Sequence, residues 1–135
     1  MYKGKKVSLV FPAYNEEGNI AGAIKDFQSP KLVDEIIVVD NNSRDNTSTI
    51  AKKEGARVVL EKNQGYGFAL RRGLKEAKGE LIILCEPDAT FSAQDLPRLL
   101  ALTDKYDLAM GTRTNKKYIG GGANMGILLR FGNIS

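Results

Sequence analysis

Short apolar runs, each ending in polar or acidic residues, are the feature that most constrains how this chain can fold. The clearest run is residues 81–85, five apolar residues that lead directly into Glu86, Pro87 and Asp88. A continuous apolar run of this length is typical of a strand buried on both faces of a parallel sheet. Because proline cannot donate to a sheet ladder, we expect this strand to stop at Pro87.

The same pattern recurs along the chain, and segments with helical spacing separate its copies. We expect strands at residues 7–11, 34–40, 57–60, 81–85 and 107–110, with Pro12 ending the first of them. The expected helices begin at Asn15 as an N-cap, near residue 47, after the glycine loop at 65–67, and at a capping box at 92–95. This alternation with short connections predicts an α/β fold, a three-layer α/β/α sandwich around a mostly parallel sheet.

Polar side chains follow the predicted strands and should share one edge of the sheet. Right-handed crossovers place the carboxyl ends of the strands together, where open α/β sheets bind ligands. The residues gathered there are Tyr14, Asp40, Glu86, Asp88 and Arg113. Glu86 and Asp88 stand two residues apart and can converge on one hard divalent cation that substrate phosphates share. The alternative for this pair is a solvated acidic turn.

Each of these residues has a chemical interpretation. A Mg²⁺ or Mn²⁺ ion between the two carboxylates and a diphosphate would offset charge on a leaving group. Arg113 can add a charge-assisted hydrogen bond to the same phosphates. Asp40 can accept hydrogen bonds from a base or a ribose, or it can cap its own turn. Tyr14 can line a base pocket, or it can lie at the edge of the core.

Composition excludes several other kinds of site. The chain has 135 residues, of which 42% are hydrophobic, and this fits one globular domain. The net charge of +4 is too small and too dispersed to predict a nucleic-acid partner. Histidine is absent, which excludes a Ser-His-Asp triad or a histidine-ligated zinc within this chain. Cys85 is the only cysteine, so no internal disulfide can form.

The familiar nucleotide-binding motifs are missing as well. The loop at residues 65–67 lacks the G-x-x-x-x-G-K-[ST] pattern of a P-loop, and no G-x-G-x-x-G follows the first strand. A sugar-1-phosphate nucleotidyltransferase would need a glycine-rich basic loop where Pro12 to Asn15 stand. No stretch is apolar enough over ~18 residues to span a bilayer, and we reject a signal peptide.

Four segments, taken in order, resemble a known family. They are residues 7–16, residues 37–47, residues 63–80 and the triplet at 86–88. Together they resemble the family 2 glycosyltransferases of the GT-A fold, and most closely dolichyl-phosphate mannosyltransferases and other polyprenyl-phosphate glycosyltransferases. The resemblance covers roughly residues 7 to 122, with natural spacing between the motifs.

The resemblance implies an inverting transfer of a sugar from a GDP- or UDP-sugar to an acceptor, a polyprenyl or dolichyl phosphate or a glycan. It implies Mg²⁺ or Mn²⁺ at Glu86 and Asp88, and catalytic roles for Asp88 and Arg113. The substrate-binding residues that it implies are Pro12, Tyr14, Glu16, Asp40, Asn41, Lys62 and Gly65. It is compatible with a cytoplasmic protein at the cytoplasmic face of a membrane, and it indicates no oligomeric state.

The chain departs from the family pattern at three positions. Glu86 replaces the usual first aspartate of the metal motif, Asn41 replaces a second aspartate after the second strand, and Thr90 stands where glutamine is often found. The longer side chain of Glu86 keeps the ligand type but can change the metal geometry. A module that binds nucleotide-sugars without turnover, or a scaffold that keeps the fold, is therefore the alternative function.

We expect residues 1–135 to form a single donor-binding domain that ends before the acceptor-side and membrane-associated elements. Residues 113–135 include the glycine run at 120–122 and are expected to be mobile. Residues 127–131 are expected to begin a helix, either an interfacial helix or an ordinary one.

Overall fold

The computed structural model describes residues 1–88 and 92–104 in full, and residues 108–110 and 127–130 as backbone. The strands are β1 (Val7–Ala13), β2 (Glu35–Asp40), β3 (Arg57–Leu60), β4 (Leu81–Leu84), β5 (Leu108–Met110) and β6 (Ile127–Arg130). The helices are α1 (Ile20–Gln28), α2 (Thr47–Lys53), α3 (Tyr66–Glu76), α4 (Leu96–Ala101) and two short 3-10 turns, Ala93–Asp95 and Leu102–Asp104.

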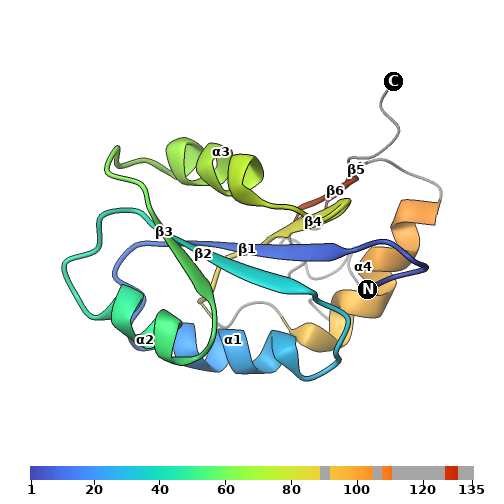
Figure 1. The fold of residues 1–135 in the computed structure, drawn as a ribbon, viewed down its shortest axis with the longest axis horizontal. Coiled ribbons are helices and arrows are strands. Elements are labelled where there is room, and N and C mark those ends of the chain that lie inside the picture. Colours follow the sequence, from blue (N-terminus) through green and yellow to red (C-terminus); the bar gives the residue numbers. More distant parts are fainter. Residues whose placement is uncertain (89–91, 105–107, 111–126, 131–135) are drawn as a thin grey trace, which may run out of the picture.

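All six strands form one sheet in the order β3-β2-β1-β4-β6-β5. The first four pair in parallel, and β6 runs antiparallel to both of its neighbours, β4 and β5. Figure 1 shows α3 on one face of the sheet and α1, α2 and α4 on the other. The α/β class, the three layers and the mostly parallel sheet predicted from the sequence are therefore confirmed.

The expectation of a helix at residues 127–131 is wrong where the structure describes the segment. Residues 127–130 form β6, which pairs with β4 through Leu84↔Ile127 and with β5 through Met110↔Ile127. The run Ile-Leu-Leu is short and apolar, so periodicity alone does not separate a strand from a helix. The other residues of the segment expected to be mobile lie outside the described part.

Pro12 does not end β1, contrary to the expectation from the sequence. The strand continues to Ala13, with Pro12 opposite Val39 in the register with β2. Alternate residues of β1 point their backbone groups to opposite sides: the carbonyl of Val10 accepts from Cys85 beyond β4, and that of Ala13 accepts from Asn41 beyond β2. Pro12 therefore faces the β4 side, where the pairing has ended at Leu84, and no backbone donor is needed there.

Two apolar layers hold the helices on the sheet. On one side, Leu9 and Phe11 pack with Ile24 and Phe27 of α1, and the rings of Phe11 and Phe27 meet edge to face with their centroids 5.7 Å apart. On the other side, Val10 and residues of β2 pack under α3. Because successive residues of a strand point to opposite faces, β1 supplies both layers, and its seven residues are all buried.

Helix α1 begins at Ile20, later than the sequence predicted. Asn15 has a positive φ of 53° and lies in the connecting loop, and Asn19 occupies the N-cap position. The side chain of Asn15 accepts a hydrogen bond from the N–H of Arg44 instead of capping the helix. Ile20, Ile24 and Phe27 form the buried face of α1. No helix in the described part of the chain is long and apolar enough to cross a membrane.

Candidate functional site

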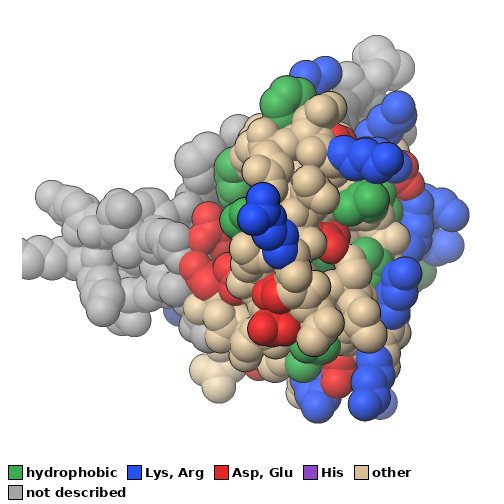
Figure 2. All heavy atoms as spheres, turned by 90° about the vertical axis from the view of Figure 1, so that its left-hand side faces the viewer, with side chains coloured by type: hydrophobic (Ala, Val, Ile, Leu, Met, Phe, Trp, Pro, Cys, Tyr) green, Lys and Arg blue, Asp and Glu red, His purple; other side chains and the backbone are tan. Residues whose placement is uncertain are grey.

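The carboxyl ends of β1, β2 and β4 lie on one edge of the sheet, as the topology requires. The loops that leave these strands carry Tyr14, Asn41 and the acidic pair Glu86 and Asp88. Figure 2 views this edge: acidic side chains gather in its middle, and most of the lysine and arginine side chains lie toward its margins. The edge therefore presents polar and acidic groups in the place where the sequence predicted a ligand site.

Hydrogen bonds hold the loop after β1 against the loop after β2. The N–H of Asn15 donates to the hydroxyl of Ser43 over 2.9 Å, and the N–H of Glu16 donates to the hydroxyl of Thr47 over 2.9 Å. The N–H of Glu17 donates to the carboxylate of Asp45 over 3.2 Å. These hydrogen bonds fix the backbone of the loop after β1 relative to that of the loop after β2.

Asp40 is buried, and its carboxylate serves its own turn. Its Oδ1 accepts the N–H of Ser43 over 2.8 Å, and its Oδ2 accepts the hydroxyl of Ser48. It is 5% exposed. The turn-capping interpretation of Asp40 is therefore present in the structure, and contact with a base or ribose remains a prediction.

Asn41 is also buried, and its amide holds the loop that precedes α3. Its Nδ2 donates to the carbonyls of Glu61 and Asn63, over 3.1 and 2.9 Å. Its Oδ1 accepts the N–H of Gly65 over 2.9 Å. Aspartate could accept from Gly65 but could not donate to the two carbonyls. The departure from the family pattern at this position therefore has a physical reason in this chain.

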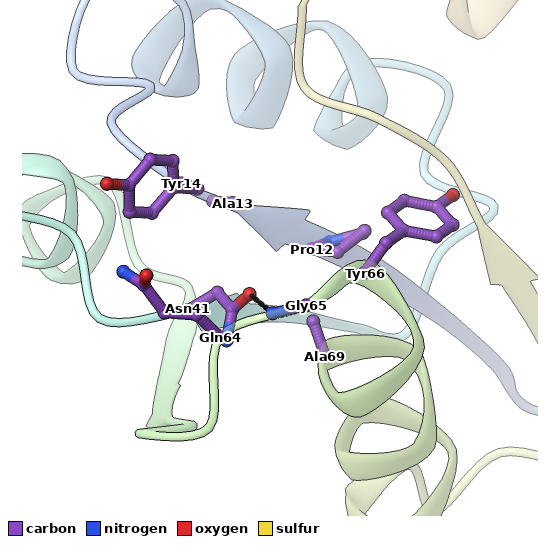
Figure 3. Close-up of a pocket in the computed structure, with 8 residues that line it drawn as sticks. All are labelled: Pro12, Ala13, Tyr14, Asn41, Gln64, Gly65, Tyr66 and Ala69. Carbon is purple, nitrogen blue, oxygen red and sulfur yellow. Dashed lines mark hydrogen bonds between the residues drawn. The ribbon is translucent and has the colours of Figure 1, made fainter.

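A pocket of about 350 Å³ opens between the ends of β1 and β2 and the start of α3. The residues that line it are Pro12, Ala13, Tyr14, Asn41, Gln64, Gly65, Tyr66 and Ala69. Figure 3 shows the rings of Tyr14 and Tyr66 on opposite sides of this pocket, with Pro12 and Ala13 of β1 between them. The pocket thus combines aromatic walls, an apolar floor and an amide, as small-molecule sites usually do.

The pocket contains four of the substrate-binding residues that the resemblance implied, namely Pro12, Tyr14, Asn41 and Gly65. Tyr14 is 48% exposed, so it is not a residue of the core edge. Glu16, Asp40 and Lys62 do not line it. Glu16 accepts a hydrogen bond from Asn19 over 3.2 Å, and Lys62 is exposed on the loop before α3.

Tyr66 and Gln64 are lining residues that we did not single out from the sequence. Both belong to the glycine-containing loop and helix start that formed one of the four family motifs. The available signal was an aromatic residue at the first position of a helix, directly after Gly65, whose φ of 143° favours glycine.

Glu86 and Asp88 follow β4 and are both partly buried. Glu86 lines a second pocket of about 380 Å³, formed with residues of α1 and with Ser92. Burial raises the pKa of the neighbouring Cys85 thiol well above its usual range, and the negative charges of Asp88 and Glu86 raise it further. That thiol therefore stays protonated at neutral pH.

Glu86 and Asp88 fit a metal ion that also takes ligands from a bound substrate, and they do not fit one held by protein ligands alone. Within the described residues no group of three or more His, Cys, Asp or Glu side chains is placed to hold a metal. Two carboxylates supply hard oxygen ligands, and Mg²⁺ or Mn²⁺ commonly takes the rest from substrate phosphates and water. Arg113 and Thr90 lie outside the described residues.

The geometry defines a class of protein, an α/β domain with a pocket of about 350 Å³ and two acidic residues, Glu86 and Asp88, at the carboxyl edge of its sheet. Residues 8–131 match the family model described as glycosyl transferase family 2. This match covers most of the chain, so the chain belongs to the family 2 glycosyltransferases, and the resemblance seen in the sequence is confirmed.

Similar curated proteins are named as glycosyltransferases or hexose transferases. An uncharacterized glycosyltransferase from Mycobacterium tuberculosis is 37% identical over 111 residues, 82% of this chain and 50% of the relative. A dolichyl-phosphate hexose transferase from Haloferax volcanii is 33% identical over 138 residues, 99% of this chain and 58% of the relative. The chain thus spans about half the length of these relatives.

Solved structures share the fold. Glucosyl-3-phosphoglycerate synthase from Mycobacterium tuberculosis, in complex with Mn²⁺, UDP-glucose and phosphoglyceric acid, superposes with a TM-score of 0.75 at 26% identity. The same enzyme in complex with Mg²⁺ and UDP gives a TM-score of 0.75 at 25% identity. Each likeness covers 94% of this chain and 57% of the synthase.

Proposed function

We propose that this chain is the donor-binding part of an inverting glycosyltransferase that uses a UDP- or GDP-sugar. The observation that carries the proposal is the pocket between Tyr14, Asn41 and Gly65, at the sheet edge that also bears Glu86 and Asp88. Membership of family 2 and the UDP complexes of the synthase support the choice of ligand.

Glu86 and Asp88 are the residues that would hold a divalent cation against the donor diphosphate. When bound there, Mg²⁺ or Mn²⁺ would stabilise the charge that develops on the leaving diphosphate. The protein's own part is to place two carboxylates just past β4, where the donor phosphates would enter. Arg113 is proposed to add a charge-assisted hydrogen bond to those phosphates.

The proposed acceptor is a polyprenyl or dolichyl phosphate. Relatives named for such acceptors include the dolichyl-phosphate hexose transferase and an undecaprenyl-phosphate 4-deoxy-4-formamido-L-arabinose transferase from Pseudomonas savastanoi. A phosphate oxygen of the lipid would attack the anomeric carbon in line, forming a bond to that carbon as the bond to the diphosphate breaks. A lipid phosphate is already ionised near neutral pH, so this attack needs little help from a general base. Because this acceptor is a membrane lipid, the proposal includes contact with a membrane surface, and we propose its cytoplasmic face.

A transfer assay tests the proposal. The full-length gene product is incubated with Mn²⁺, a polyprenyl phosphate and radiolabelled UDP- or GDP-hexose, and labelled lipid is extracted. We expect labelled lipid with one of the two donors and a loss of at least about tenfold in Asp88→Asn. Binding of the nucleotide without labelled lipid or another glycosylated product would instead favour the alternative, a module without turnover.

A further inference from the structure

We propose that Tyr66 binds the nucleoside part of the donor and that Asn41 positions it. The inference rests on the proposed function and deepens it, since it assigns roles to two residues of the same pocket. The resemblance implied that Asn41 contacts the substrate directly. Its hydrogen bonds to residues 61, 63 and 65 favour an indirect role, in which Asn41 positions the loop that leads to Tyr66.

Tyr66 forms one wall of the pocket. Its side chain is 52% exposed, and its ring lies across the pocket from that of Tyr14 (Figure 3). Pro12, Ala13 and Ala69 make the surface between the two rings apolar. A nucleoside has a flat base that can lie against an aromatic ring, and the pocket volume of about 350 Å³ is in the range of small-molecule sites. Removing an aromatic ring that stacks on a base typically weakens binding by about fivefold to a hundredfold.

A short chain of bonds joins Asn41 to Tyr66. Asn41 accepts the N–H of Gly65, the residue that immediately precedes Tyr66, as the dashed line in Figure 3 marks. The carbonyl of Gly65 in turn accepts the N–H of Ala69 over 3.2 Å, within the first turn of α3. The two Nδ2 bonds of Asn41 fix the carbonyls of Glu61 and Asn63 in the same loop. Asn41 therefore sets where α3 begins and where its first side chain stands.

The chemistry of position 41 makes this role specific to an amide. An aspartate would turn a carboxylate toward the carbonyl oxygens of Glu61 and Asn63, which repel it, and only the bond from Gly65 would remain. Because Asn41 is 6% exposed, water cannot readily replace the lost donors. We therefore expect Asn41→Asp to displace the 61–65 loop and the wall that follows it.

Calorimetry on the 135-residue chain tests the role of Tyr66, with UDP and GDP titrated in saturating Mn²⁺. We expect Tyr66→Ala to weaken the better nucleotide about tenfold, and Tyr66→Phe, which keeps the ring, to stay within about twofold. The matched control is Phe68→Ala, because Phe68 is 47% exposed in the same turn of α3 and does not line the pocket. Inorganic pyrophosphate, which has no nucleoside, should bind all variants alike.

A double-mutant cycle tests the positioning role of Asn41. We expect Asn41→Asp to weaken nucleotide binding about fivefold alone, but less than about twofold in the Tyr66→Ala background, because the wall it positions is already gone. Melting temperatures are recorded for every variant. If Asn41→Asp melts below the assay temperature, Asn41→Ser takes its place.

The outcomes separate this inference from the proposed function. If the wild-type chain binds neither UDP nor GDP, both are overturned. If it binds one of them and Tyr66→Ala has no effect, or Phe68→Ala has an equal effect, the role of Tyr66 is overturned while the proposed function stands. Additive losses in the double variant overturn the positioning role of Asn41.

Discussion

Single polar side chains hold the loops of the candidate site together, and Asp45 does so in the loop after β2. Its carboxylate accepts the N–H and hydroxyl of Thr47 and the N–H of Glu17. Partial burial alone would raise the pKa of Asp45, but the bonds from Thr47 and Glu17 outweigh it and hold the pKa below the ordinary value of 3.8. The ionised form is thus the one that the folded state prefers.

The pH dependence of stability follows from this shift. Because the pKa of Asp45 is lower in the folded state, the unfolded chain binds the proton more tightly. The stabilisation that ionised Asp45 gives to the folded state is therefore complete at pH values above the pKa of the unfolded chain. It is lost as the pH falls through the pKa of the folded state. We predict that Asp45→Ala lowers the unfolding free energy most at neutral pH and that its difference from wild type shrinks below pH 3.8. Urea unfolding of both proteins, from neutral pH to below pH 3.8, measures this difference in unfolding free energy.

Asp45→Asn is the control for that prediction, since its single amide oxygen can accept the two bonds from Thr47 as Oδ1 does, and it does not titrate. Its amide nitrogen cannot accept the N–H of Glu17, so the loss of stability should be smaller than in Asp45→Ala and should vary in the same pH window. A destabilisation by Asp45→Ala that is constant down to the acid limit of folding would contradict the role given to the carboxylate.

At the scale of elements, the packing of α3 on the sheet depends on one glycine. A Cβ added at Gly73 would overlap Val10 Cγ1 and lie 3.4 Å from Val39 Cγ2. We predict that Gly73→Ala destabilises the protein by ~1–3 kcal/mol, because overpacking outweighs the gain of ~1 kcal/mol in helix propensity. Urea unfolding followed by far-ultraviolet circular dichroism gives the free energy.

Gly67 supplies the matched control in the same helix. A Cβ there would meet no heavy atom of the described structure within 4 Å, so Gly67→Ala should leave stability unchanged or raise it by up to ~1 kcal/mol. Equal effects of the two substitutions would show that α3 does not press on β1 and β2 through Gly73.

The strand and helix pattern of residues 20–101 was predictable because each element has its own periodicity and its own polar boundary. The errors fall where tertiary context decides. Pro12 remains in β1 because the pairing with β4 ends before it. Asn15 does not cap α1, because its side chain accepts a hydrogen bond from Arg44 in the loop after β2. The run at 127–130 becomes a strand because it can pair with β4 and β5 at once. None of these partners is visible from the local sequence.

At the scale of the whole molecule, topology predicted the edge but not the details of the site. The sequence placed Tyr14, Asp40, Glu86 and Asp88 at one edge of the sheet, and the structure places Asp40 at the end of β2 and the other three after the strands expected. The sequence could not show that Asp40 directs its side chain to its own turn, or that Asn41 directs its side chain to the loop before α3. Tyr66 was missed because its importance comes from lying across the pocket from Tyr14, a relation between distant segments.

Glu86 and Asp88 are proposed to hold a divalent cation against a nucleoside diphosphate bound at this edge, and calorimetry with UDP and GDP measures whether they do. With wild-type chain we expect one nucleotide to bind at least about tenfold more tightly in Mn²⁺ than in EDTA. In Glu86→Gln/Asp88→Asn that gain should vanish, while the metal-free affinity is unchanged. A gain from Mn²⁺ that survives the double substitution, or no nucleotide binding by the wild type at all, would contradict the account.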